Sequence, residues 1–268
     1  MTEPVLQVRE DGAVAWLTLS RPERLNALNP ALVQALLTYF QALYRRPELR
    51  VVLLQGAGSA FCSGLDLKEA PDARALGVPR MLEVQRDLRD IMIAMRRCPQ
   101  PIISLVQGAA SGGGFALALA SDLRLATPDA RFNAAFIRIG LSACDVGVSY
   151  FLPRMVGSSV AAHYLLTGRF MDAARAQALG LVSTVAPWPE LQQEARALVD
   201  DMLRASPLGL RLTKDALGHA VDAASLEAVV ALEDRNQILC TRGPDFGEGI
   251  SAFLEKRKPQ YGKSGKAG

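Results

Sequence analysis

Two glycine-containing turns constrain what this chain can fold into more than any other feature of its sequence. The first lies in F-C-S-G-L-D-L-K-E at 61–69, and the second lies in G-A-A-S-G-G-G-F-A-L at 108–117. A run of strand-forming apolar residues precedes each turn, at 51–54 and at 102–106, and a helical pattern follows. Repeated rounds of strand and helix are typical of α/β proteins. The sequence therefore predicts an α/β core built from related units.

The same turns indicate chemistry on a carbonyl group. Glycine lets a ligand approach the backbone closely, and N–H groups that enter a helix favour negative charge. If the two turns face each other, their N–H groups form an oxyanion hole, which stabilises charge developing on a carbonyl oxygen. The chain has no P-loop and no G-x-G-x-x-G pattern, so a nucleotide site has no support.

Hydrophobic periodicity predicts the other elements of the core. Two short strand-like runs joined by Asp-Gly within 5–19 predict a β-hairpin. An apolar pattern that begins after Asn29 predicts a helix, and a second amphipathic helix is expected over 80–97. Further short strands are expected at 123–126 and 131–133.

The C-terminal part of the chain is predicted to be almost wholly helical. The expected helices cover residues 190–204, 207–221 and 223–239. No flexible linker separates this part from the rest. We therefore expect a core over residues 1–190, and a helical region over 191–268 that packs on the core or on another subunit.

The composition excludes several classes of protein. Half of the residues are hydrophobic and 21% are charged, which is typical of a globular protein. A net charge of +3 gives no general reason to expect nucleic acid or membrane as a partner. The four cysteines lack the spacing of a metal site, so no metal is expected. With no secretory signal and no long apolar run, the cytoplasm is the expected location.

Further motifs appear in a fixed order with the two turns. They are R-P-E-R-L-N-A-L at 21–28, L-L-T-G-R-F-M-D-A-A-R-A-Q-A-L-G-L-V at 165–182 and G-I-S-A-F-L-E-K-R-K-P at 249–259. With these motifs the chain resembles the crotonase (enoyl-CoA hydratase/isomerase) family from about residue 5 to residue 260. The resemblance implies a crotonase-like spiral of ββα units, assembly into trimers or hexamers, and binding of acyl-CoA thioesters. Coenzyme A is then part of the substrate, and no separate cofactor is expected.

The resemblance also implies roles for residues of this chain. The thioester oxygen is expected to accept hydrogen bonds from the backbone N–H groups of Leu65 and Gly113, which stabilise an enolate. Residues implied to contact the substrate are Arg24, Ser63, Gly64, Asp66, Leu67, Gly112, Phe136, Phe253 and Lys256. Phe253 and Lys256 are expected to cover coenzyme A from a neighbouring subunit.

The chain departs from the family pattern at the residues that move protons. Hydratases of this family resemble one another in having two glutamates that position a water. The matching positions here are Ala116, three residues after Gly113, and Phe136, four residues before Gly140. Neither side chain can transfer a proton, although hydration needs groups that activate water and reprotonate the α-carbon.

One carboxylate does match a position that relatives use. Asp145 lies eight residues before Pro153, as an aspartate does in several double-bond isomerases of the family. Counted from Gly140, the loop is about one residue longer than theirs, and the alternative role for Asp145 is to cap the loop or a helix N-terminus.

The sequence favours a double-bond isomerase with Asp145 as base. Two alternatives stay open at this point. One is an enoyl-CoA hydratase or another acyl-CoA lyase that positions water with other groups. The other is a catalytically degenerate protein that binds acyl-CoA or a partner without turnover.

Overall fold

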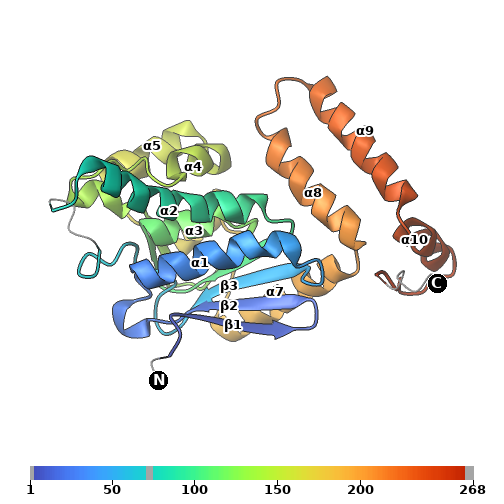
Figure 1. Cartoon of the computed structure of the whole chain (residues 1–268), viewed down its shortest axis with the longest axis horizontal. Helices are drawn as coiled ribbons and strands as arrows, with labels where there is room; N and C mark the ends of the chain where they lie inside the picture. The colour runs from blue at the N-terminus through green and yellow to red at the C-terminus, as the bar shows by residue number, and fades with distance from the viewer. Residues whose placement is uncertain (1–2, 71–74, 263–268) are drawn as a thin grey trace.

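The two apolar runs form neighbouring strands of a six-stranded sheet in the computed structural model, which describes residues 3–70 and 75–262 (Figure 1). The strand order is β1-β2-β3-β4-β6-β9, with β1 and β2 antiparallel and the other pairs parallel. A smaller sheet has the order β5-β7-β8. The strands are β1 (Leu6–Asp11), β2 (Val14–Leu19), β3 (Val51–Gly56), β4 (Ile102–Val106), β5 (Ala109–Ser111), β6 (Leu123–Ala126), β7 (Arg131–Asn133), β8 (Met171–Asp172) and β9 (Thr184–Val185).

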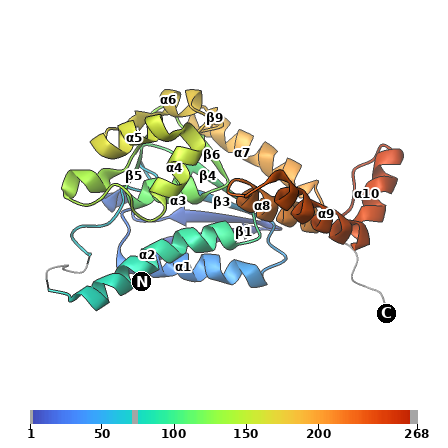
Figure 2. The same cartoon turned by 90° about the horizontal axis from the view of Figure 1, so that it is seen from above.

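Helices cover both faces of the larger sheet. Figure 2 shows α1 and α2 on one side of the strands and α7 on the other. The helices are α1 (Pro30–Ala42), α2 (Val78–Arg97), α3 (Gly113–Ala120), α4 (Val148–Val156), α5 (Ser158–Thr167), α6 (Ala173–Ala178), α7 (Trp188–Leu203), α8 (Pro207–Ala220), α9 (Leu226–Arg242) and α10 (Asp245–Leu254). Short 3-10 helices are η1 (Pro22–Arg24), η2 (Leu43–Arg45) and η3 (Ala135–Ile139).

The two faces of the sheet bury alternate residues of each strand. In β3, Val52 and Leu54 join the larger core under α1, α2 and α3, whereas Val51 and Leu53 pack with Leu191 on the side of α7. This alternation follows from the two-residue period of a strand. Because helices cover both faces of the sheet at β3 and β4, these two strands are largely apolar, which explains the continuous apolar runs in the sequence.

Helix α3 follows the small sheet and is buried along its whole length. All eight of its residues are buried, so its pattern has no polar face. Small residues allow this close packing, because glycine and alanine side chains leave room for the neighbouring backbone. The N-terminus of α3 is Gly113, so the second glycine turn opens directly onto a helix.

The helices predicted for the C-terminal part are confirmed, with α10 in addition. The predicted division after residue 190 falls inside α7, and α7 packs on the sheet through Leu191, Ala195 and Val199. Helices α8, α9 and α10 extend away from the sheet (Figure 1). Within the described ranges, no helix is long and apolar enough to cross a membrane.

Candidate active site

The two glycine turns lie side by side and are joined by backbone hydrogen bonds. The N–H of Phe61 donates to the carbonyl of Gln107 at 2.7 Å, and the N–H of Cys62 donates to that of Ala109 at 3.0 Å. In return, the N–H of Ser111 donates to the carbonyl of Cys62 at 2.9 Å. Parallel strands β3 and β4 bring the turns to the same edge of the sheet. The geometry confirms that the turns face each other.

Two glycines make this close approach possible. Gly64 has a φ of 97°, and a Cβ placed there would lie 2.8 Å from the carbonyl oxygen of Ser111. A Cβ on Gly114 would lie 2.1 Å from the carbonyl oxygen of Cys62. Real Cβ atoms essentially never come nearer than 3.0 Å. Only glycine therefore fits at either position while the turns stay in contact.

The N–H groups of Leu65 and Gly113 have no hydrogen-bond acceptor among residues 3–70 and 75–262. The two turns hold them near each other, because a Cβ on Gly64 would lie 3.5 Å from the nitrogen of Gly113. Gly113 is also the first residue of α3, where the helix dipole favours negative charge. Two free donors beside a helix N-terminus form a site suited to an oxyanion.

The segment around Leu28 supports the first turn from the other side. Its N–H donates to the carbonyl of Gly64 at 2.7 Å, and its carbonyl accepts from the N–H of Asp66 at 3.0 Å. The Asp66 carboxylate lies 3.0 Å from the guanidinium of Arg21, and both side chains are buried. Arg21 also contacts Glu69 at 2.6 Å. Residues 21–28 thus hold the first turn in place through the backbone hydrogen bonds of Leu28 and the ion pairs of Arg21.

Asp66 is charged in this arrangement. Burial alone would raise its pKa, but hydrogen bonds from the backbone N–H groups of Lys68 and Glu69 and from Arg21 lower the pKa below its ordinary value. The sequence placed Asp66 among the substrate contacts. The structure gives its carboxylate an internal partner, so its clearest contribution is to position the turn.

Cys62 supports the same turn as a neutral thiol. The backbone N–H of Gly64 donates to its sulfur, and full burial raises the pKa of Cys62 to about 12. No nucleophilic thiolate is therefore present beside the turns at neutral pH. No sequence pattern predicted this contact, because it depends on the bend of the backbone at Gly64.

The positions that differ from hydratases line the second turn with apolar groups. Ala116 lies one helical turn into α3 and is buried. Phe136 belongs to η3, and its ring is the nearest side chain to Gly112, with a Cβ on Gly112 falling 3.5 Å from the ring. No proton-transferring side chain occupies either position. The two positions at which the sequence departs from the hydratase pattern therefore hold apolar side chains close to the free N–H of Gly113.

Asp145 lies in the loop between η3 and α4. Its carboxylate accepts hydrogen bonds from the side chain of Gln85 on α2 and from the N–H of Val146 at 2.8 Å. It lines a hollow of about 380 Å³ together with residues of α2, including Arg86 and Arg89. In the described part of the chain, these contacts join Asp145 to α2 and its own loop, and none joins it to Leu65 or Gly113.

The predicted coenzyme A contacts fall into two groups. Arg24 is exposed beside the first turn, where the hydroxyl of Ser63 donates to its carbonyl at 3.4 Å. Leu67 is also exposed there. Phe253 and Lys256 lie at the end of α10, which Figure 1 shows far from α3. In the single chain, these two residues therefore lie away from the two turns.

The chain matches the enoyl-CoA hydratase/isomerase family model over residues 9–264. It belongs to this family. A probable enoyl-CoA hydratase of Mycobacterium bovis is 39% identical over 92% of this chain and 89% of its own length. The 1,2-epoxyphenylacetyl-CoA isomerase of Escherichia coli is 35% identical over 97% of this chain and 99% of its own.

Solved structures of the family have the same fold. The enoyl-CoA hydratase of Mycobacterium smegmatis superposes with a TM-score of 0.90 at 34% identity, over 97% of this chain and 99% of that one. The enoyl-CoA hydratase of Polaromonas superposes with a TM-score of 0.89 at 33% identity, over 96% and 99%. The predicted family and crotonase-like fold are confirmed, and the chain is an enzyme of the enoyl-CoA hydratase/isomerase family.

Proposed function

We propose that this enzyme moves a carbon–carbon double bond in an enoyl-CoA thioester. The observation that carries the proposal is the pair of free N–H groups at Leu65 and Gly113 beside two apolar positions, Ala116 and Phe136. The donors suit a thioester oxygen that becomes an enolate. The apolar neighbours lack the groups that would bind and activate a water.

The proposed reaction needs one base and no water. Asp145 takes a proton from one carbon, the C–H bond breaks, and its electrons move toward the thioester oxygen. The N–H groups of Leu65 and Gly113 stabilise the resulting enolate, each contributing about 3–4 kcal/mol in the transition state. The proton then returns from Asp145 to a carbon two positions away, and the double bond has moved. A single carboxylate is sufficient because it acts first as base and then as acid.

Two further observations support this choice. Asp145 is the carboxylate that faces α2 from the loop after Phe136, and Gln85 orients it. Among the named relatives, the Escherichia coli protein is an isomerase, and the alignment spans nearly the whole of both chains. Hydration is the second candidate, because several similar proteins carry the name enoyl-CoA hydratase.

The decisive experiment compares substrates and then removes the base. Purified enzyme is assayed with 2-enoyl, 3-enoyl and dienoyl thioesters, and the α-proton is followed in deuterated water. We expect isomerisation of a 3-enoyl thioester and poor hydration of crotonyl-CoA. Asp145→Asn keeps the side-chain shape, and we expect it to lower the isomerisation rate by roughly 100- to 10,000-fold while thioester affinity stays nearly unchanged.

Asp129→Asn provides the matched control, because Asp129 is an exposed carboxylate in a surface turn. Efficient hydration by the wild type would establish the hydratase alternative. Thioester binding without turnover or α-proton exchange would establish the degenerate binding protein. If Asp145→Asn isomerises as fast as wild type, the base lies elsewhere.

The C-terminal helices support a multimeric enzyme. Large apolar side chains of this region are exposed in the single chain, including Leu217, Leu226, Ile238, Phe253 and Leu254. Exposed apolar surface of this extent favours burial against another subunit. We expect light scattering to give a trimer or hexamer, and a monomer would contradict the placement of Phe253 and Lys256 over a neighbour's substrate.

A further inference from the structure

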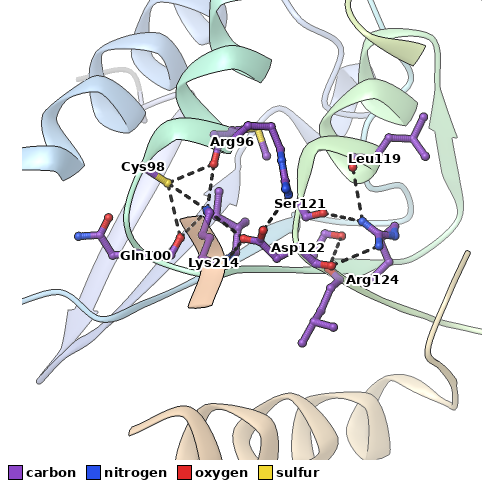
Figure 3. A network of polar contacts seen from close by, with 12 residues as sticks. Arg96, Cys98, Gln100, Leu119, Ser121, Asp122, Arg124 and Lys214 are labelled. Atoms are coloured by element: carbon purple, nitrogen blue, oxygen red, sulfur yellow. Dashed lines mark hydrogen bonds and ion pairs between the residues drawn. The ribbon is translucent and has the colours of Figure 1, made fainter. Parts of the chain in front are cut away.

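A network of charged side chains surrounds the C-terminal end of α3, opposite the end that carries Gly113 (Figure 3). Asp122 is its centre. One carboxylate oxygen accepts from Arg96 of α2 at 2.7 Å, and the other lies 2.9 Å from the ammonium of Lys214. The second oxygen also accepts from the N–H of Ile102 at 2.8 Å. Asp122 thus connects α2, α8 and the start of β4 just beyond the end of α3.

Arg124 satisfies the last carbonyl groups of α3. Its guanidinium donates to the carbonyls of Ala118 at 3.3 Å and Leu119 at 3.5 Å, and also to that of Ser121. Another N–H reaches the carbonyl of Leu181 at 2.8 Å. Burial lowers the pKa of Arg124 to about 10, so it stays charged at neutral pH. A cation at this end is favoured by the helix dipole, and it ties α3 to its surroundings.

Lys214 brings α8 into the same network. Its ammonium donates to the carbonyls of Met95 at 3.0 Å and Gln100 at 2.7 Å, besides contacting Asp122. Three oxygens therefore surround a group with three N–H donors. The side chain is only 5% exposed. A buried lysine is tolerated only when it is paired and hydrogen-bonded in this way.

Lys214 differs from the other residues of α8 in its burial. Lys214 is the only buried residue of this helix, which lies wholly within the described part of the chain. Leu210 is half-buried against the core on the side of α7, and Arg211 donates a hydrogen bond to the hydroxyl of Tyr44 at 3.4 Å. Just beyond the end of the helix, Asp222 pairs with Arg154 at 2.8 Å. Among these contacts of α8, the ion pair of Lys214 with Asp122 is the one made by a buried charge, and it joins α8 to the residues that follow α3.

Helix α3 connects this anchor with the reaction site. It is about 12 Å long, at 1.5 Å for each of its eight residues. It is buried throughout, so it has little freedom to bend. A shift at Ser121 and Asp122 is therefore transmitted to Gly113 at the other end, unless the backbone bonds at the second turn resist it.

We propose that Lys214 is a positioning residue, which holds α3 through Asp122 and thereby fixes the N–H of Gly113 in the oxyanion hole. This proposal rests on the proposed function for its catalytic consequence. In this proposal, α8 helps to fix the oxyanion hole and also connects the C-terminal helices to the core. The lysine does not touch the substrate and acts only through α3.

The test substitutes the cation and measures both structure and rate. Lys214→Met keeps the length of the side chain and removes its charge. We expect the rate constant kcat to fall roughly 10- to 100-fold, because displacements of about 1 Å can have effects of that size. The KM for the thioester should change less than kcat. Hydrogen exchange followed by mass spectrometry should show faster exchange in the peptide over 113–124.

Two further variants make the outcome decisive. Asp122→Asn keeps an acceptor for the N–H of Ile102 but loses the charge, so its effect should not add to that of Lys214→Met in the double variant. Arg204→Met removes an exposed cation that pairs with Asp201 at 2.8 Å, and it should change neither kcat nor the exchange of 113–124. Light scattering and circular dichroism confirm that each variant is assembled and folded.

The two proposals fail in different ways. If wild-type enzyme shows no isomerisation, the proposed function fails, but the exchange measurement still tests the anchor. Unchanged exchange over 113–124 in folded Lys214→Met overturns the anchor, as does an unchanged kcat in an enzyme that isomerises. A rise in KM alone would also overturn it, because a donor out of place must slow the chemical step.

Discussion

The contact between the two glycine turns can be tested at Gly114, where the backbone has no spare room. In Gly114→Ala, the new Cβ would lie 2.1 Å from the carbonyl oxygen of Cys62 and 2.7 Å from its Cβ. Both neighbours are held in place, the first being backbone, so no flexible side chain can move aside. Since carbon atoms pack at about 3.5–4.0 Å, the two turns must separate by roughly 1 Å.

That displacement acts on stability and on catalysis. The carbonyl of Cys62 would move away from the N–H of Ser111, which now donates to it at 2.9 Å. Overpacking of this kind costs about 1–3 kcal/mol in the free energy of unfolding. The N–H groups of Leu65 and Gly113 would move apart, and a misplacement of about 1 Å is expected to lower kcat by about 100-fold.

The assay measures kcat with the best thioester and the free energy of unfolding in urea. Gly218→Ala, in the last turn of α8, is the matched control, because its Cβ would meet its nearest atom, the Nη2 of Arg96, at 3.8 Å. Replacing a helical glycine by alanine should stabilise the protein by about 0.5–1 kcal/mol and leave kcat unchanged. A Gly114→Ala enzyme with wild-type kcat and stability would show that contact between the two turns does not determine the positions of the N–H groups of Leu65 and Gly113.

Two other predictions concern the charged residues Lys256, just after α10, and Asp66, in the first glycine turn. Lys256→Ala should weaken acyl-CoA binding about five-fold, or by about 1 kcal/mol, at low salt and by less at high salt, because salt already screens the wild-type contact. Calorimetry at two ionic strengths measures both effects. Equal affinities of wild type and variant at low salt would show that Lys256 is a solvated residue without a role in binding. Asp66→Asn should lower the free energy of unfolding by about 1.5–3 kcal/mol at pH 7. Because the folded pKa of Asp66 lies below its ordinary value, its stabilising contribution is complete above the unfolded pKa of about 3.9 and is lost as the pH falls through the folded pKa. The unfolding free energies of wild type and Asp66→Asn, measured in urea, should therefore converge as the pH falls below the unfolded pKa of about 3.9, and a constant difference would exclude a charged Asp66.

The architecture could be predicted because its elements have local signals. The Asp-Gly hairpin formed between β1 and β2, and the apolar runs before the turns became β3 and β4. Asn29 caps α1 by accepting from the N–H of Leu32 at 2.9 Å, as a residue before the first helical position commonly does. Each of these signals involves residues near one another in sequence, where periodicity and capping act directly.

Contacts between distant segments could not be predicted in this way. The pairing of Arg21 with Asp66 and Glu69 joins residues far apart in the chain, and the sequence shows only that these charges exist. Lys214 looks like an ordinary exposed lysine on an amphipathic helix, yet it is buried against Asp122. Burial of a charge depends on which carbonyl groups the fold brings to it, and no local pattern records that.

The proposed reaction assigns different tasks to the backbone and to the side chains. In the proposed reaction, the backbone N–H groups of Leu65 and Gly113 stabilise the enolate, and we propose that glycines, α3 and the network around Asp122 hold them in position. These features leave the oxyanion site intact when side chains around it change. Ala116, Phe136 and Asp145 can therefore differ from the residues of a hydratase without loss of the oxyanion hole. In the proposed reaction, the backbone stabilises the enolate formed from the thioester, and the side chains decide which carbon receives the proton.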